Sequence, residues 1–231
     1  MLDLWRRQRF TALLLLLVLN LVVAPTVSTV TQSSGLGAIL PLVSFTAVIV
    51  AALFAATQAR RSRWIALSVG GAALACAWGG VLTSAHELRV VEELLTTSFL
   101  LTVFVLLVRH VLLQRKVTVN VVNAALCAYL LLGLGWASLY SLIELIEPGS
   151  FRLPEGDPSF DDAADEASTG PVYFSFVTLL TLGYGEIVPV SSIARMCAVV
   201  EAFLGQVLLV VLVSRLVGLQ VGQEMLDAEE H

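Results

Sequence analysis

Charged residues are scarce in this sequence. Of its 231 residues, 13% are Asp, Glu, Lys or Arg, whereas an ordinary soluble domain carries about 25%. Hydrophobic residues make up 58% of the chain, and the mean hydropathy is +0.89. This composition argues against an ordinary soluble domain and predicts a chain that is surrounded by lipid.

Cysteine and catalytic motifs are also scarce. The three cysteines, Cys76, Cys127 and Cys197, lie in apolar segments and form no Cys-x-x-Cys pair, so we interpret them as small buried residues. We find no metal-ligand cluster, phosphate-binding glycine loop or Ser/Cys–His arrangement. We therefore expect no enzymatic activity, no cofactor and no nucleic-acid partner.

Six apolar segments are long enough to cross a bilayer as helices, since spanning about 30 Å takes about 20 helical residues. They cover residues 10–30, 36–58, 64–84, 90–114, 118–146 and 192–219. None shows the alternation of barrel strands. The expected fold class is an all-α membrane protein with six transmembrane helices in contact with membrane lipids. The first segment has one alternative interpretation, a signal peptide, because it follows a run of arginines.

The basic residues are distributed unequally between the two predicted sides of the membrane. One side carries three, Arg89, Arg152 and Arg195. The other carries ten, namely Arg6, Arg7, Arg9, Arg60, Arg61, Arg63, Arg109, Arg115, Lys116 and Arg215. By the positive-inside rule the second side is cytoplasmic. We expect a multi-pass protein of the cytoplasmic membrane with both termini in the cytoplasm.

The segment 147–170 differs from the rest of the chain. It contains one basic residue, Arg152, and seven acids: Glu147, Glu155, Asp157, Asp161, Asp162, Asp165 and Glu166. The predicted topology makes it an extracellular loop, and its composition is typical of a mobile segment. Its negative field would raise the local cation concentration.

A short apolar segment, Pro171 to Leu180, follows this loop. As a helix it reaches only about 15 Å, half the thickness of the bilayer. The residues TLGYGEIVP come next, with two glycines and a proline. A half-length helix followed by irregular chain is tolerated in a membrane only where protein or water surrounds it. We therefore predict a re-entrant helix at 171–180 and a loop that lines a wet space.

The loop has the chemistry needed to hold a dehydrated cation. Backbone carbonyls can replace the hydration shell of K⁺ if several successive ones face one axis. This arrangement requires positive φ at alternate residues, which Gly183 and Gly185 adopt at little cost. Thr181 adds a hydroxyl at the inner end, while Leu182 and Tyr184 would turn their side chains away. We expect K⁺ to bind the carbonyls of residues 181–184 and the Thr181 hydroxyl.

The segment YFSFVTLLTLGYGEIVP resembles the pore loop of the potassium-channel superfamily, whose pattern is T-x-T-T-x-G-Y-G-D. Thr178 matches the first threonine of that pattern, Thr181 the filter threonine, and residues 183–185 the GYG core. The resemblance implies a filter built from four loops. Because this chain has one loop, the protein would be a homotetramer with K⁺ as its permeant ion.

The chain departs from the family pattern at three positions around the loop. Leu180 replaces a threonine, Leu182 replaces Val or Ile, and Glu186 replaces Asp. Tyr173 and Phe174 occupy the aromatic positions of the pore helix from which the family's donor supports the residue after GYG, and neither is Trp. The resemblance is strong over 118–221, the expected pore domain, and only architectural over 1–117.

The last predicted helix carries further candidate site residues. Gly205 would be either a hinge or a close packing position. Glu201 would be either a protonation-sensitive contact behind the filter or a structural carboxyl. One face would line a central cavity and form an apolar gate, through Gln206, Leu209, Val213, Val217 and Val221.

The first four predicted helices, residues 1–117, match a voltage sensor only in number. Residues 90–108 contain no basic residue. Each charge that moves through the membrane field contributes only about 2.3 kcal/mol per 100 mV, so steep voltage gating needs several charges. We therefore expect a channel that is not strongly voltage-gated, with a short acidic cytoplasmic tail at 222–231. The Arg-rich, Lys-poor composition suggests a prokaryotic source. A weakly selective cation channel and a non-conducting scaffold or sensor remain as alternatives.

Overall fold

The computed structural model describes residues 10–22, 43, 46–51, 68, 70–75, 86–153 and 170–229. Of the first three predicted helices it therefore describes Phe10–Val22, which is helical, and parts of the other two. Most of the acidic loop lies outside the described residues, as does Cys76. The six transmembrane helices and the boundaries of the 1–117 domain thus remain predictions.

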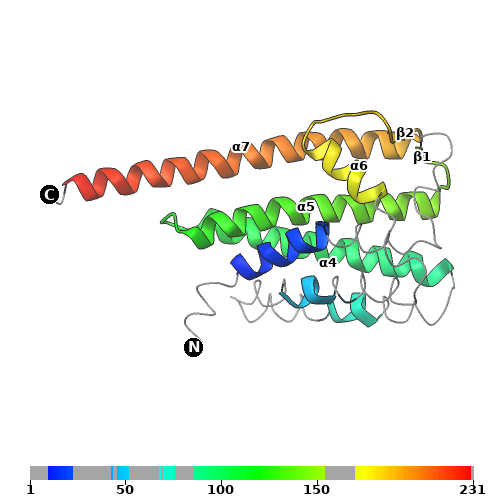
Figure 1. Cartoon of the computed structure of the whole chain (residues 1–231), viewed down its shortest axis with the longest axis horizontal. Coiled ribbons are helices and arrows are strands. Elements are labelled where there is room, and N and C mark those ends of the chain that lie inside the picture. Colours follow the sequence, from blue (N-terminus) through cyan, green and yellow to red (C-terminus); the bar gives the residue numbers. More distant parts are fainter. Residues whose placement is uncertain are drawn as a thin grey trace.

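The described elements follow in the order α4 (His86–Leu113), α5 (Val119–Ile146), β1 (Phe151–Arg152), α6 (Gly170–Leu179), β2 (Val188–Pro189) and α7 (Ser192–Glu229) (Figure 1). Among the described residues, three helices are long and apolar enough to cross a membrane, over Arg89–Leu113, Val119–Ile146 and Ser192–Gln223. The architecture agrees with the predicted all-α membrane protein. The short helix α6 covers residues 170–179, one residue earlier at each end than the predicted range 171–180.

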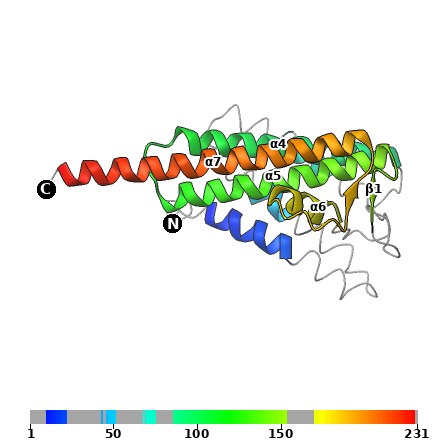
Figure 2. The same cartoon turned by 90° about the horizontal axis from the view of Figure 1, so that it is seen from above.

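Helix α5 lies at the centre of the described structure, with α4 on one side and α6 and α7 on the other (Figure 1). Seen from above, α7 runs along the length of α5 (Figure 2). Its buried positions include many small residues, which allow neighbouring helices to approach closely. They include Ala124, Ala125, Ala128, Gly133, Gly135, Ala137, Ser138 and Ser141. A hydrogen bond of 2.9 Å from Thr97 Oγ1 to Ser138 Oγ joins α4 to α5.

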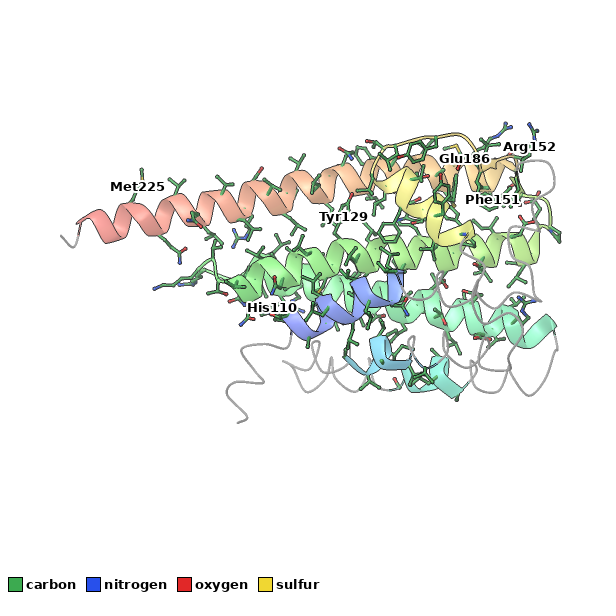
Figure 3. All side chains as sticks on the ribbon, in the orientation of Figure 1. His110, Tyr129, Phe151, Arg152, Glu186 and Met225 are labelled. Atoms are coloured by element: carbon green, nitrogen blue, oxygen red, sulfur yellow. The ribbon has the colours of Figure 1, made fainter. Side chains whose placement is uncertain are left out.

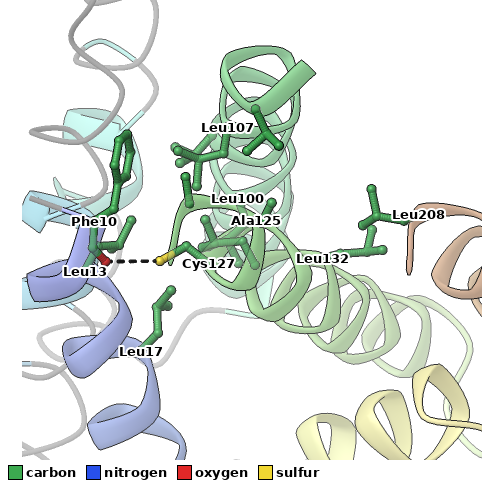
Figure 4. Packing of buried hydrophobic residues seen from close by; sticks show 14 of the residues in the cluster. Phe10, Leu13, Leu17, Leu100, Leu107, Ala125, Cys127, Leu132 and Leu208 are labelled. Carbon is green, nitrogen blue, oxygen red and sulfur yellow. Dashed lines mark hydrogen bonds between the residues drawn. The ribbon is translucent and has the colours of Figure 1, made fainter. Parts of the chain in front are cut away.

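The largest apolar core joins helix 10–22 to α4 and α5 (Figure 4). Phe10, Leu13 and Leu17 are at most 1% exposed within it. Cys127 Sγ lies 3.5 Å from the Phe10 carbonyl oxygen and is fully buried. Cys127 is thus the small buried residue that the sequence predicted, and Cys197 is a free thiol of intermediate burial.

Helix α7 is 38 residues long, which corresponds to about 57 Å. It runs beyond the predicted end of the last transmembrane segment and includes residues 222–229, expected as a separate tail. Figure 1 shows its C-terminal end projecting past α4 and α5. Two hydrogen bonds tie α7 to the α4–α5 linker: Arg215 Nη2 to the Gln114 carbonyl (3.1 Å), and Val117 N–H to Gln223 Oε1 (3.3 Å).

The end of the molecule that carries α6 is closed by a two-residue antiparallel pairing that the sequence did not predict. Phe151 of β1 lies opposite Pro189 of β2. Phe151 also packs edge-on against Tyr140 and Phe174, with ring centroids 5.4 and 5.2 Å away. The preceding turn is held by Glu144, whose carboxylate accepts hydrogen bonds from the N–H groups of residues 149 and 151.

Gly133 provides a test of the α5–α6 packing. A Cβ added there would lie 2.7 Å from Phe176 Cζ, so Gly133→Ala must displace a rigid ring. We expect overpacking to lower stability by about 1–3 kcal/mol, measured by thermal unfolding in detergent. Gly218→Ala is the control, because no atom lies within 4 Å of the added Cβ and alanine favours a helix by about 1 kcal/mol. Equal shifts in both variants would contradict this packing.

Candidate ion-conduction site

Helix α6 is too short to span a membrane and is held by its neighbours. The Tyr129 hydroxyl of α5 donates to the Leu179 carbonyl at 3.1 Å, and Figure 3 shows this side chain between α5 and α6. Gly205 of α7 allows a similar close approach, since a Cβ there would lie 2.6 Å from Leu179 Cδ1. α7 continues as a helix through this position. The structure thus gives Gly205 a packing role, and its role as a hinge remains a prediction.

The C-terminus of α6 is closed by the hydrogen-bond pattern of a Schellman cap. Leu182 N–H donates to the Val177 carbonyl at 2.9 Å, and Thr181 N–H donates to the Thr178 carbonyl at 3.0 Å. The residue between the helix and the loop in this motif has positive φ and is usually glycine. Here it is Thr181, with φ of 58°. Thr178 thus contacts the loop through its backbone carbonyl.

Positive φ recurs at every second residue of the loop that follows. The φ angles of Thr181, Gly183 and Gly185 are 58°, 59° and 84°, whereas Leu182 and Tyr184 have no positive φ. In an ordinary strand successive carbonyls alternate in direction, and a change in the sign of φ at every second residue cancels this alternation. Gly183 and Gly185 therefore have the conformation that the sequence predicted, and Thr181 shares it.

Apart from its backbone bonds to the end of α6, the loop is exposed on the surface of the described chain. Residues 181–185 are all exposed, and the side chains of Leu182 and Tyr184 are 50% and 64% exposed. No atom lies within 4 Å of a Cβ built on Gly183 or Gly185. The described part of one chain therefore supplies the shape of the loop but does not enclose it.

Beyond the loop, Tyr173 and Glu186 are paired as the sequence suggested. The Tyr173 hydroxyl donates to Glu186 Oε2 at 2.6 Å, which joins the first turns of α6 to the chain after Gly185. Figure 3 shows Glu186 beside α6. This hydrogen bond, together with desolvation and the charge of Glu186, raises the pKa of Tyr173 to about 12. The phenol thus keeps its proton at physiological pH and serves as the donor.

Glu201 lies behind α6 and has no exposed surface. Its Oε2 accepts a hydrogen bond of 2.6 Å from the Tyr140 hydroxyl, and its Oε1 contacts Ser175 Oγ. Ser175 Oγ also lies 2.8 Å from the Gly133 carbonyl oxygen. Glu201 thus connects α7 to both α5 and α6, as expected for either of its two predicted roles.

The predicted cavity and gate residues lie on the side of α7 that the chain leaves open. Buried positions of α7 form one stripe, through Ala194, Glu201, Gly205, Leu208 and Leu212. The five predicted lining residues are all exposed: Gln206, Leu209, Val213, Val217 and Val221. The structure of one chain does not bring them together around a cavity.

The residues that hold α6 in place were not predicted from the sequence. Tyr129, Tyr140, Ser175 and Gly133 all contact α6 or Glu201. The hydroxyl groups in apolar segments are a weak signal, because such groups need partners in lipid. Glu201 is a stronger one, since a buried acid requires donors from neighbouring helices.

Comparison with known proteins supports the class of this site. Residues 165–219, which include α6, the 181–185 loop and most of α7, match a protein-family model described as an ion channel. The match confirms the predicted family resemblance over these residues and points to a non-enzymatic membrane protein. No curated protein and no solved structure matches the chain. The chain thus carries a segment similar to ion channels, together with long apolar helices.

Glu186→Gln tests the contact at the outer end of the loop. The hydrogen bond requires the phenol proton, so it is complete below about pH 10, the ordinary pKa of tyrosine, and is lost as the pH rises through 12. Removing the carboxylate should lower the pKa of Tyr173 toward 10. Tyrosinate absorbance measures this, as the difference between each protein and its Tyr173→Phe counterpart. Identical titrations of Tyr173 in wild type and Glu186→Gln would refute the contact.

Proposed function

We propose that the protein is one subunit of a potassium-selective channel, in which residues 181–185 of four chains form the ion filter. K⁺ would be bound by the carbonyls of residues 181–184 and by the Thr181 hydroxyl. The channel would conduct passively and would not be strongly voltage-gated. This proposal goes beyond the ion-channel match by naming the ion, the binding atoms and the assembly.

The positive φ at Thr181, Gly183 and Gly185 is the observation that carries the proposal. Alternating conformations turn successive carbonyls toward one side of the loop, where they form a column of oxygens. Such a column can replace the hydration shell of K⁺, which is the requirement for selective conduction. The side chains of Leu182 and Tyr184 would then pack behind the column.

Helix α6 supports the proposal as the pore helix. It is about 15 Å long and ends directly at the loop. The C-terminal end of a helix carries a partial negative charge equivalent to about half an elementary charge, which favours a cation nearby. Bonds from Tyr129 and Ser175 to backbone carbonyls on the facing helices hold it against α5.

A tetramer would complete both the filter and the surface of α7. One loop presents oxygens from one side only, whereas K⁺ must be surrounded. The exposed face of α7 is strongly apolar, with Phe203 and Val210 66% and 62% exposed. Neighbouring subunits and membrane lipids would cover this face. In the assembly, Gln206, Leu209 and Val213 would line the cavity, and Val217 and Val221 would form the gate.

The distribution of charge supports a location in the cytoplasmic membrane with both termini inside. Arg215 bonds to Gln114, which places it at the same end as Arg115 and Lys116 of the linker. At the opposite end Arg195 Nε donates to the Pro189 carbonyl of β2. Helix α4 has no basic residue between Arg89 and Arg109, so it offers no row of gating charges.

Potassium flux into liposomes that contain the purified protein tests the proposal. We expect flux in the wild type and its loss in Gly183→Ala. A Cβ at Gly183 meets no atom within 4 Å, but at φ of 59° it costs about 1–2 kcal/mol in each chain. Gly71→Ala is the control, since it adds the same methyl group with no atom of the described chain within 4 Å, on a helical residue outside the proposed pore, and should conduct normally. Equal flux in wild type and Gly183→Ala would defeat the filter assignment.

A weakly selective cation channel is the second candidate, because Leu180, Leu182 and Glu186 depart from the family pattern around the filter. Reversal potentials under opposed K⁺ and Na⁺ gradients separate the two. A potential near the K⁺ equilibrium value supports the selective channel, and one near zero supports the alternative. Wild-type protein that folds and transports neither ion would instead be a scaffold or sensor.

A further inference from the structure

Three buried side chains meet where α5, α6 and α7 converge. Tyr140, Ser175 and Glu201 are all 0% exposed. Together with the Gly133 carbonyl they make three oxygen–oxygen contacts: Tyr140 with Glu201, Glu201 with Ser175, and Ser175 with Gly133. We refer to these four groups as the Glu201 cluster.

The protonation state of Glu201 follows from the number of hydrogens that these contacts require. Each of the three contacts requires one. The Tyr140 hydroxyl supplies one, the Ser175 hydroxyl supplies one, and a backbone carbonyl supplies none. If Glu201 were ionised it would supply none, and one pair of oxygens would lie within hydrogen-bond distance with no hydrogen between them. A protonated Glu201 supplies the third hydrogen.

We infer that Glu201 is held as a neutral carboxylic acid whose proton is donated to Ser175. Ser175 then donates to the Gly133 carbonyl, and Tyr140 donates to the other oxygen of Glu201. The chain of hydrogen bonds begins and ends on α5 and passes through α7 and α6. Gly133 and Tyr140 are seven residues apart, about two helical turns, so they lie on the same face of α5.

The surroundings of Glu201 favour the neutral form. Within the described part of the chain, only Tyr140 and Ser175 bond to this carboxyl, and neither is a cation. The other titratable neighbours are Tyr129 on α5 and Cys197 on α7, and α6 contains no charged residue. Two hydroxyl donors offset only part of the desolvation penalty of a buried carboxylate that has no cation beside it. Protonation removes that penalty and keeps every contact.

This assignment makes Glu201 a positioning residue for the conducting loop, a role that rests on the proposed function. Ser175 lies in the middle of α6, and α6 leads directly into Thr181. By joining α6 to α5 and α7, the neutral acid fixes the depth and rotation of the short helix. The direction in which the loop carbonyls point depends on that placement.

Infrared spectroscopy of the full chain in liposomes at neutral pH tests the protonation directly. We expect the carbonyl stretching band of a protonated carboxylic acid in wild type and its loss in Glu201→Gln. A wild-type spectrum that shows no such band relative to Glu201→Gln would overturn the inference. This measurement does not depend on ion flux.

Substitution provides a second test, because glutamine reproduces the bonding of a protonated acid and not that of a carboxylate. Its N–H can donate to Ser175 while its oxygen accepts from Tyr140. We expect Glu201→Gln to keep thermal stability and to conduct within about twofold of wild type. Glu201→Ala loses two buried hydrogen bonds, so flux should fall roughly tenfold or more. If Glu201→Gln is as impaired as Glu201→Ala, Glu201 acts as an anion and the inference fails.

Two further variants keep the test decisive if Glu201→Ala does not fold. Tyr140→Phe and Ser175→Ala each remove one hydroxyl with little change in volume, and both should lower flux and stability more than Glu201→Gln does. The opposite order would refute the chain of hydrogen bonds. A wild-type protein without K⁺ flux would defeat the proposed function, whereas the infrared band and the order of thermal stabilities would still decide the state of Glu201.

Discussion

The structure around the loop depends on how a short helix can end inside a membrane, where its last carbonyls need hydrogen-bond partners. In lipid every backbone polar group needs a partner from the protein. At the end of α6 the Val177 and Thr178 carbonyls accept from the loop itself, and Tyr129 donates to the Leu179 carbonyl. The bonds that end the helix are the same bonds that set the start of the loop, so the helix and the loop form one unit.

Close packing then fixes the position of this unit. Phe176 of α6 lies against the backbone of α5 at Gly133, and Leu179 lies against α7 at Gly205. Both contacts leave no room for a Cβ, so small residues on the long helices set the distance to the short one. Close-packed protein interiors transmit small displacements instead of absorbing them. The Glu201 cluster adds direction to this contact, since hydrogen bonds depend on angle and packing alone does not.

The sequence predicted α5 and α6 to within one residue, and also the start of α7, because apolar runs, proline and glycine mark these boundaries. Apolar runs define the two long helices, and Pro171 and the glycines after Leu180 bracket the short one. It could not predict the β1–β2 pair, because each strand has two residues and Phe151 meets Pro189 only through the tertiary fold. Tyr140 and Ser175 were missed for a related reason: their importance comes from Glu201, which lies 61 and 26 residues away along the chain.

Thr181 breaks a local rule at the point where the loop begins. Glycine would occupy this cap without strain, whereas a β-branched residue with positive φ is an outlier that costs about 1–3 kcal/mol. The surrounding bonds overcome that cost, since Leu182 and Thr181 are both tied to the last turn of α6. In the proposed filter the strain has a use, because glycine has no hydroxyl to offer an ion at the inner end. Local preference is thus set aside at the residue where backbone geometry and side-chain chemistry would act on the same cation.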